Sequence, residues 1–161
     1  MELKIGRSYH IKNEFFSYAK DDHLMSNKEG KGKRPHFVLI KDGHNADIYW
    51  AIPQSSQIKK YTTILMKKKE KYGRCDTIVI GKFGGKDSAF LIQNMFPVIK
   101  NYIDHEHTIS GISVKVNSHL YREIVYKAQR VLRLHYMGCK IIFPNIDRIY
   151  KLMEEKISHA E

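Results

Sequence analysis

The chain is built from short apolar runs separated by turn residues, and this alternation constrains its fold more than any other feature of the sequence. Runs at residues 37–40 and 48–52 flank Asp42-Gly43, and the runs CDTIVIGKF and SAFLIQNMF flank residues 84–87, which include two glycines. Runs rich in β-branched and aromatic residues, joined by turns of this chemistry, are typical of antiparallel hairpins. The sequence therefore predicts two β-hairpins.

The remaining segments extend this pattern with helices. In chain order we predict a strand at 6–11, a short helix capped by Asn13 and ending at Ala19, an exposed flexible loop at 20–34, a basic helix at 59–73, a β-branched run at 109–116, a long helix at 120–135, a strand at 140–143 and a last helix capped by Asn145. Several short strands with terminal helices predict an α+β fold, a small antiparallel β-barrel with helices packed outside it. A length of 161 residues favours a single domain over residues 1–161.

The charge balance points to a polyanionic partner. Lys and Arg total 28 against 17 Asp and Glu, which gives a formal net charge of +11. No apolar stretch approaches the roughly 18 residues of a membrane-spanning helix, and the first residues lack the apolar region of a signal peptide. We therefore expect a cytoplasmic protein without a membrane partner. The two cysteines form no CxxC pattern, so neither a zinc ribbon nor a disulfide framework is indicated.

The loop GKGKRP supplies the first candidate contacts to phosphate. Lys31 and Lys33 lie on a flexible backbone, and the planar guanidinium of Arg34 can hold two phosphate oxygens. An ordinary solvated linker has the same composition, so the loop alone leaves both interpretations open.

The tract IPQSSQIKKY is the strongest candidate for catalysis. Ser55 and Ser56 come at the end of an apolar strand, and Lys59, Lys60 and Tyr61 follow. Cleavage of RNA without a metal requires attack by the 2′-OH, stabilisation of the charged phosphorane and protonation of the leaving 5′-oxygen, and hydroxyls and lysines can serve these steps. The alternative is a polar turn in which Ser56 or Gln57 lies near a helix N-cap.

The long helix carries a cationic face formed by Arg122, Lys127, Arg130 and Arg133. Such residues often serve only solubility. Next to the basic loop, the same face would form a groove for an RNA backbone.

The nine histidines do not indicate a metal centre. Neither His105-Glu106-His107 nor Asp21-Asp22-His23 has the ligand spacing of a zinc site or a facial triad, so we expect no metal and no cofactor. His135 falls on the apolar face of the long helix, where we expect a packing role.

The succession KRPHF, YWAIPQSSQIKKY, DTIVIGK and FLIQNMFPV resembles the toxins of type III toxin–antitoxin systems, the ToxN, AbiQ and CptN group, and the CptN branch most closely. The resemblance spans nearly the whole chain. It implies an SH3-like barrel related to the MazF/Kid toxins, and an endoribonuclease that cleaves mRNA and its own repetitive antitoxin transcript to 2′,3′-cyclic phosphates. It also implies an antitoxin RNA whose repeats fold as pseudoknots, bind the toxin directly and close with it into a cyclic assembly.

The resemblance assigns roles to particular positions. The family's hydroxyl pair falls on Ser55 and Ser56, and its loop lysine falls on Lys33. Where the family commonly has a lysine directly after the hydroxyls, this chain has Gln57, so Lys59 or Lys60 would stabilise the phosphate, with Lys59 favoured. The base is unassigned: a lysine with a lowered pKa and His36 are both candidates.

Two alternatives from other classes remain. One is a non-catalytic RNA-binding regulatory module in which the serines only cap a helix. The other is a DNA-binding repressor, but the chain has no helix-turn-helix pattern, so we expect no DNA partner.

Overall fold

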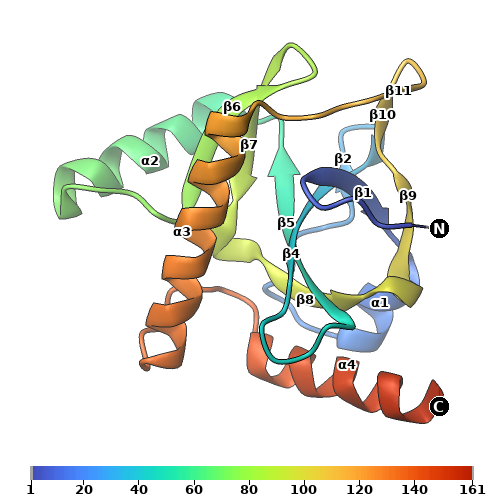
Figure 1. The fold of residues 1–161 in the computed structure, drawn as a ribbon. Helices are drawn as coiled ribbons and strands as arrows, with labels where there is room; N and C mark the ends of the chain where they lie inside the picture. The colour runs from blue at the N-terminus through green and yellow to red at the C-terminus, as the bar shows by residue number, and fades with distance from the viewer. Residues whose placement is uncertain (1, 161) are drawn as a thin grey trace.

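A strongly bent antiparallel sheet forms the centre of the protein, whose computed structural model describes residues 2–160 (Figure 1). Its seven strands run in the order β6-β7-β5-β4-β1-β9, and β8 also pairs with β5. The strands are β1 (Arg7–Ile11), β4 (His36–Lys41), β5 (Ile48–Ser55), β6 (Ile78–Phe83), β7 (Lys86–Leu91), β8 (Phe96–Ile99) and β9 (Ile103–Glu106). Two small hairpins, β2 (Lys28–Glu29) with β3 (Gly32–Lys33) and β10 (Thr108–Ile109) with β11 (Ile112–Ser113), stand apart from it.

The bend arises at β5, which changes partner along its length. Residues 48–51 pair with β8, whereas Gln54 and Ser55 pair with β7, and β4 stays on the other side of the strand. Pro53, which has no N–H to donate, lies where the partner changes. Strand β5 therefore belongs both to the part of the sheet that contains β8 and to the part that contains β7, and it ends at Ser55.

The predicted α+β class is confirmed, but a closed barrel is not found. Among residues 2–160, the edge strands β6 and β9 do not pair with each other, so the sheet stays open. A second difference lies in the run SAFLIQNMF, where the sequence had predicted one strand: a 3-10 turn at Ile92–Asn94 divides it into β7 and β8.

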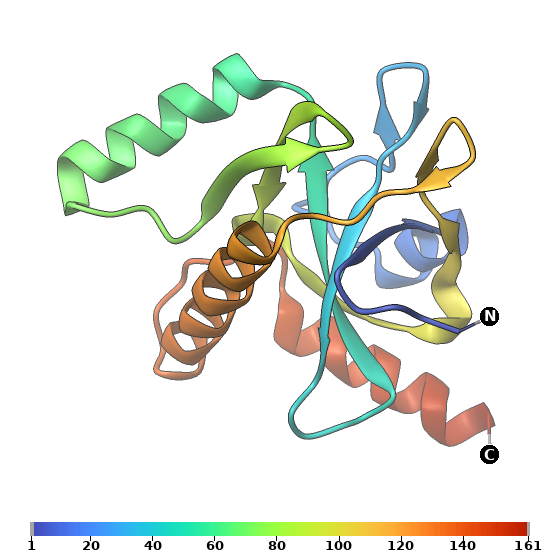
Figure 2. The same ribbon diagram turned by 45° about the horizontal axis from the view of Figure 1, so that its top comes forward.

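Four helices cover the sheet: α1 (Asn13–Ala19), α2 (Ile58–Tyr72), α3 (Ser118–Tyr136) and α4 (Ile146–Ala160). Helix α3 buries the stripe Leu120, Ile124, Ala128 and Val131, as its spacing predicted, and Asn117 caps it by accepting a hydrogen bond from the Leu120 N–H at 2.8 Å. Helices α1 and α4 pack on a second core around β1 and β8. Helix α2 projects from the body and buries only Tyr61 (Figure 2).

Three local predictions are wrong. Residues 140–143 form no strand, and Phe143 instead donates one backbone hydrogen bond to the carbonyl of Gln93. Asn13 is the first residue of α1 and not its cap, a position held by Lys12 without a side-chain bond. The segment 20–34 is not a free loop, because it contains the β2–β3 hairpin and ends in the buried Arg34.

None of the helices in the described range combines the length and the apolar character that crossing a bilayer requires.

Candidate functional site

A cavity of about 210 Å³ lies where β5 ends, beside the predicted serine pair. Its walls come from four parts of the chain that are distant in sequence. They are formed by Glu29 and Pro35, by Gln54, Ser55 and Ser56, by Phe83, Lys86, Asp87 and Ser88, and by His107 and Ile109. The cavity therefore joins the serine pair to the β6–β7 turn and to the chain after β9.

Glu29 holds the exposed serine of the pair. The backbone N–H of Ser56 donates to Glu29 Oε1 at 2.7 Å, and the Ser56 hydroxyl donates to the same oxygen at 2.5 Å. The other oxygen of Glu29 accepts from Arg34 at 2.6 Å. Burial raises the pKa of Glu29, but the hydrogen bonds from Ser56 and the charge of Arg34 outweigh it, so the pKa lies below its usual value. Glu29 is therefore an anion at neutral pH.

Ser55 is buried and has a local partner. Its Oγ accepts a hydrogen bond from the backbone N–H of Gln57 at 3.1 Å, which is the geometry of a polar turn before α2. Its hydroxyl proton is free to turn toward the cavity that the residue lines. Ser55 can therefore act both as the polar residue of the turn before α2 and as a hydroxyl of the site.

A buried polar chain supports the cavity floor. Ser8 donates its hydroxyl to Gln54 Oε1, and Gln54 Nε2 donates to Ser88 Oγ at 3.1 Å. These side chains connect β1, β5 and β7 and are all buried. Satisfied buried networks fix the position of their members, so the end of β5 is rigid.

His107 brings an imidazole to the cavity. It follows β9, its backbone N–H donates to the Ser8 carbonyl at 2.7 Å, and its Nδ1 lies 2.9 Å from Nε2 of His10. Burial and the neighbouring His105 hold the pKa of His107 below its usual value. Burial, with His107 and His105 close by, lowers the pKa of His10 to about 4. Both rings are therefore neutral at pH 7.

The predicted lysines lie on chain segments that adjoin the cavity, but they do not line it. Lys31, Lys33, Lys59 and Lys60 are exposed, Lys33 on β3 and the last two in the first turn of α2. The Nζ of Lys60 lies 5.3 Å from the centre of the Tyr61 ring. The cation that does line the cavity is Lys86, which the sequence analysis did not select.

Arg34, Tyr61 and His36 were predicted to contact RNA, but all three are buried, which argues against those roles. Arg34 donates to the carbonyls of Ser26, Lys28 and Gln54 as well as to Glu29, which leaves its guanidinium no free edge for a phosphate. Tyr61 packs in the core beneath α2.

His36 is fully buried between aromatic rings, which also argues against the acid–base role considered for it. Its ring lies 5.4 Å from that of Phe96 and 6.1 Å from that of Phe16. Burial, reinforced by the charge of Arg34, lowers its pKa to about 3. A neutral ring enclosed by the core cannot exchange protons with a substrate.

The cationic face of α3 is only partly free. Arg130 pairs with Asp76 at 3.0 Å, and Lys127 pairs with Glu123 at 2.9 Å within the helix. Arg122 and Arg133 are exposed. His135 has the predicted packing position, where its Nε2 lies 2.9 Å from Asp147 Oδ1.

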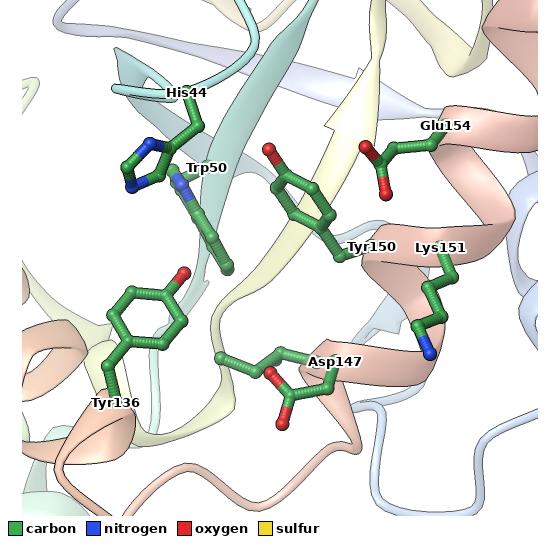
Figure 3. A pocket seen from close by; sticks show the side chains of 8 residues that line it. His44, Trp50, Tyr136, Asp147, Tyr150, Lys151 and Glu154 are labelled. Carbon is green, nitrogen blue, oxygen red and sulfur yellow. The ribbon is translucent and has the colours of Figure 1, made fainter.

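A larger cavity, of about 470 Å³, lies at α4 and is separate from the serine site (Figure 3). The rings of His44, Trp50, Tyr136 and Tyr150 surround it, together with Asp147, Lys151 and Glu154. Asp42 ties this end together by accepting from Trp50 Nε1 at 3.1 Å and from the Tyr150 hydroxyl at 2.6 Å. It contains neither of the two serines that the sequence singled out, which lie at the smaller cavity.

Comparison with solved structures finds two chains with the same architecture. One comes from a bacterial antiviral system that a processed non-coding RNA regulates, with a TM-score of 0.64, 14% identity, and coverage of 93% of this chain and 96% of that chain. The other is AbiQ, a lactococcal anti-phage endoribonuclease of a type III toxin–antitoxin system, with a TM-score of 0.63, 14% identity and 96% coverage of both chains. This chain has the AbiQ fold.

AbiQ is one of the toxins that the sequence was found to resemble, so the fold found here is that of a member of that group. No protein-family model and no curated protein matches the chain by sequence. The likeness to AbiQ is one of fold, and what the site does has to be argued from its own residues.

Sequence reasoning found the serines of this site but missed Glu29, Lys86 and His107. Glu29 is an acidic residue inside a basic tract, which was a visible signal. His107 was considered only as a metal ligand, and within residues 2–160 no cluster of three or more His, Cys, Asp or Glu side chains is arranged to hold a metal ion. The contact between His107 and His10 spans 97 positions and had no sequence signal.

Proposed function

We propose that this protein is a metal-independent endoribonuclease, the toxin of a type III toxin–antitoxin system. The observation that carries the proposal is the AbiQ fold over nearly the whole chain, with a serine pair placed in a cavity at the end of β5. AbiQ is an endoribonuclease, and the residues around this cavity suit the same chemistry.

The chemistry is transesterification, in which the ribose 2′-OH attacks the adjacent phosphate and yields a 2′,3′-cyclic phosphate and a 5′-OH. Ser56 and Ser55 orient the phosphate through their hydroxyls. Lys33 and Lys59 or Lys60, on the two segments that flank the cavity, stabilise the charge that builds on the phosphorane. Lys86 is a further cation already at the cavity wall.

Glu29 and a bound phosphate are alternative partners for the Ser56 hydroxyl. In the absence of RNA it accepts the Ser56 hydroxyl, so a phosphate that binds Ser56 has to replace this bond. Repulsion between the Glu29 carboxylate and a phosphate would disfavour binding unless nearby lysines offset it. The exposed lysines Lys31, Lys33 and Lys59 suit that role.

The proposed partner is RNA in two forms. Substrates are mRNA and the repetitive antitoxin transcript, and the inhibitor is the processed antitoxin repeat, folded as a pseudoknot and bound in a cyclic assembly. The net charge of +11 and the exposed arginines of α3 support an RNA backbone as ligand. We also propose that the fold is related to the SH3-like barrels of the MazF/Kid toxins, because the sheet bends at β5.

A cleavage assay tests the function. Purified protein is incubated in EDTA with a long transcript, cleavage sites are mapped, and the new ends are tested for a 2′,3′-cyclic phosphate. We expect cutting in EDTA, and a loss of about 10²-fold or more for Ser56→Ala combined with Lys33→Ala, because hydroxyl and cation both act in the transition state. Lys156→Ala on α4 serves as the control.

The same assay separates the alternatives. A protein that binds structured RNA tightly but cuts none in EDTA, and whose growth inhibition survives both substitutions, would be a non-catalytic RNA-binding module. Binding to duplex DNA as strong as binding to RNA at equal salt would indicate a DNA-binding protein, because electrostatic attraction alone does not distinguish the two polymers.

A further inference from the structure

His107 is held at the cavity by its backbone and by its ring. Its N–H donates to the Ser8 carbonyl at 2.7 Å, so the residue is fixed to β1 directly after β9 ends. Its ring is stacked on Phe83 of β6, with centroids 6.0 Å apart and an interplanar angle of 29°. Both His107 and Phe83 line the same cavity as Ser56. A ring held by three strands has a defined orientation toward a ligand.

His10 lies within hydrogen-bond distance of one of the two ring nitrogens of His107. The Nε2 of His10 lies 2.9 Å from Nδ1 of His107, and His10 itself is buried on β1. No hydrogen bond among residues 2–160 engages Nε2 of His107. In the tautomer used for the proposal, Nδ1 of His107 donates to Nε2 of His10, which leaves Nε2 of His107 with the lone pair that a general base needs.

The surroundings keep this imidazole neutral. Burial, with the neighbouring His105, lowers the pKa of His107, so its ring is neutral at pH 7. The titratable and charged groups near it come from every neighbouring element: His10 of β1, Glu29 of β2, Lys33 of β3, Lys82 of β6, Lys86 and Asp87 of β7, and Asp104, His105 and Glu106 of β9.

We propose that His107 is the general base of the site and that His10 is the residue that positions it. The inference rests on the proposed ribonuclease function and names the group that this function left unassigned. His107 is the histidine that shares the cavity with both serines and whose second nitrogen has a fixed partner.

The proton balance of the step is as follows. The 2′-OH gives its proton to Nε2 of His107 while its oxygen forms a bond to phosphorus. The bond from phosphorus to the 5′-oxygen breaks, its electron pair stays on that oxygen, and the oxygen takes a proton from water. The imidazolium that forms keeps its Nδ1 proton directed at His10, and it then returns the Nε2 proton to solvent.

Cleavage by single variants tests the assignment. RNA cut by the wild type is incubated with His107→Ala, His107→Gln and the control His159→Gln, at an exposed position of α4, at pH 8. We expect both His107 variants to lose about 10²- to 10⁴-fold in rate, as for loss of a general base, and His159→Gln to keep the wild-type rate. Binding to the same RNA with 2′-O-methyl riboses, which cannot be cut, should be unchanged in all three and shows that each variant is folded.

Two readouts identify a base rather than a structural residue. The wild-type rate should fall as pH is lowered through the depressed pKa of His107, and this dependence should disappear in His107→Ala. Added imidazole should restore part of the His107→Ala rate. His10→Phe, which removes the partner of Nδ1, should lower the rate and move the acidic limb of the profile, because the imidazolium loses its acceptor.

The outcomes separate this inference from the proposed function. A wild-type protein that cuts no RNA overturns both. A wild type that cuts, together with His107 variants that cut equally fast or that lose rate and RNA binding in parallel without rescue by imidazole, overturns only the role of His107.

Discussion

Ser56 directs two donors, its backbone N–H and its hydroxyl, at one oxygen of Glu29, at 2.7 and 2.5 Å. The other Glu29 oxygen binds Arg34, whose guanidinium also donates to the carbonyl of Gln54 at 2.9 Å. Glu29 belongs to β2 and Arg34 directly follows β3, so the basic hairpin that carries Lys33 is tied to the end of β5. The segments that carry Lys33 and Ser56 are therefore held together by the ion pair between Glu29 and Arg34.

Replacing Glu29 should destabilise the fold. Glu29→Gln removes the negative partner of a guanidinium whose side chain is only 6% exposed, and an uncompensated buried charge costs about 3 kcal/mol or more. Urea denaturation measures the change in the free energy of unfolding. Glu70→Gln, at an exposed position of α2, is the matched control and should cost less than about 0.5 kcal/mol. Equal losses in the two variants would show that the ion pair is not structural.

The close contact between β6 and α3 predicts a second sensitive position. A Cβ at Gly81 would lie 2.6 Å from both methyl carbons of Leu120, so Gly81→Ala has to displace a buried side chain. Overpacking of this kind costs about 1–3 kcal/mol. Gly43→Ala is the control, because nothing lies within 4 Å of its added Cβ. Thermal unfolding compares them, and a Gly81→Ala protein as stable as Gly43→Ala would mean that α3 packs differently.

The buried histidines predict a loss of stability in acid. The pKa of His36 is about 3 in the folded protein, because burial disfavours the charged ring, against 6.5 for the free side chain. Below pH 6.5 the unfolded chain binds a proton that the folded chain excludes, so stability falls as pH drops from 6.5 toward 3 and is unaffected by this group above 6.5.

A variant isolates the contribution of His36. His36→Phe keeps an aromatic ring next to Phe96 and should flatten the acid loss by several kcal/mol, since one pKa unit corresponds to about 1.4 kcal/mol. His159→Gln, at an exposed position of α4, should leave the curve unchanged. Urea denaturation at pH 4, 5, 6 and 7 provides the curves, and parallel curves for wild type and His36→Phe would contradict the burial of a neutral ring.

The sequence predicted the elements whose signals are local. The Asp42-Gly43 and Gly84-Gly85 turns mark both hairpins, and the apolar stripe from Leu120 to Val131 marks α3. Segment 20–34 was mispredicted because its composition is that of a solvated loop, while its structure depends on the pairing of Glu29 with Ser56, 27 positions away. Residues 140–143 have strand-like composition but pair with no strand, and Phe143 instead donates one backbone hydrogen bond to the 3-10 turn at Gln93.

In the candidate site, too, the residues with a local sequence signal were found and those without one were missed. Ser55 and Ser56 were found because a strand end followed by hydroxyls is visible in the sequence. His107 and Lys86 were missed because what brings them to the serines is the pairing of β5 with β7 and of β1 with β9, and periodicity does not specify which strands pair. Arg34 and His36 have the chemistry expected of RNA contacts, but Arg34 is buried by its bonds to Ser26, Lys28, Glu29 and Gln54, and His36 by its place on β4 between β1 and β5.

The free arginines of α3 predict a measurable part of RNA binding. Arg122 and Arg133 are exposed, whereas Arg130 and Lys127 are engaged with Asp76 and Glu123. Each phosphate contact contributes about 0.7 to the slope of log K against log salt for a single strand. The double variant Arg122→Gln/Arg133→Gln should therefore lower the magnitude of that slope by about 1.4 and weaken binding to all RNA sequences alike.

The control for this measurement removes the same charge from another face. Lys151→Gln/Lys156→Gln, on exposed positions of α4, lowers the net charge equally and should leave the slope close to that of the wild type. Filter binding of an uncleavable 2′-O-methyl RNA over a range of salt concentrations gives the three slopes. If the α4 pair changed the slope as much as the α3 pair, net charge alone would account for RNA binding, and α3 would have no special part in it.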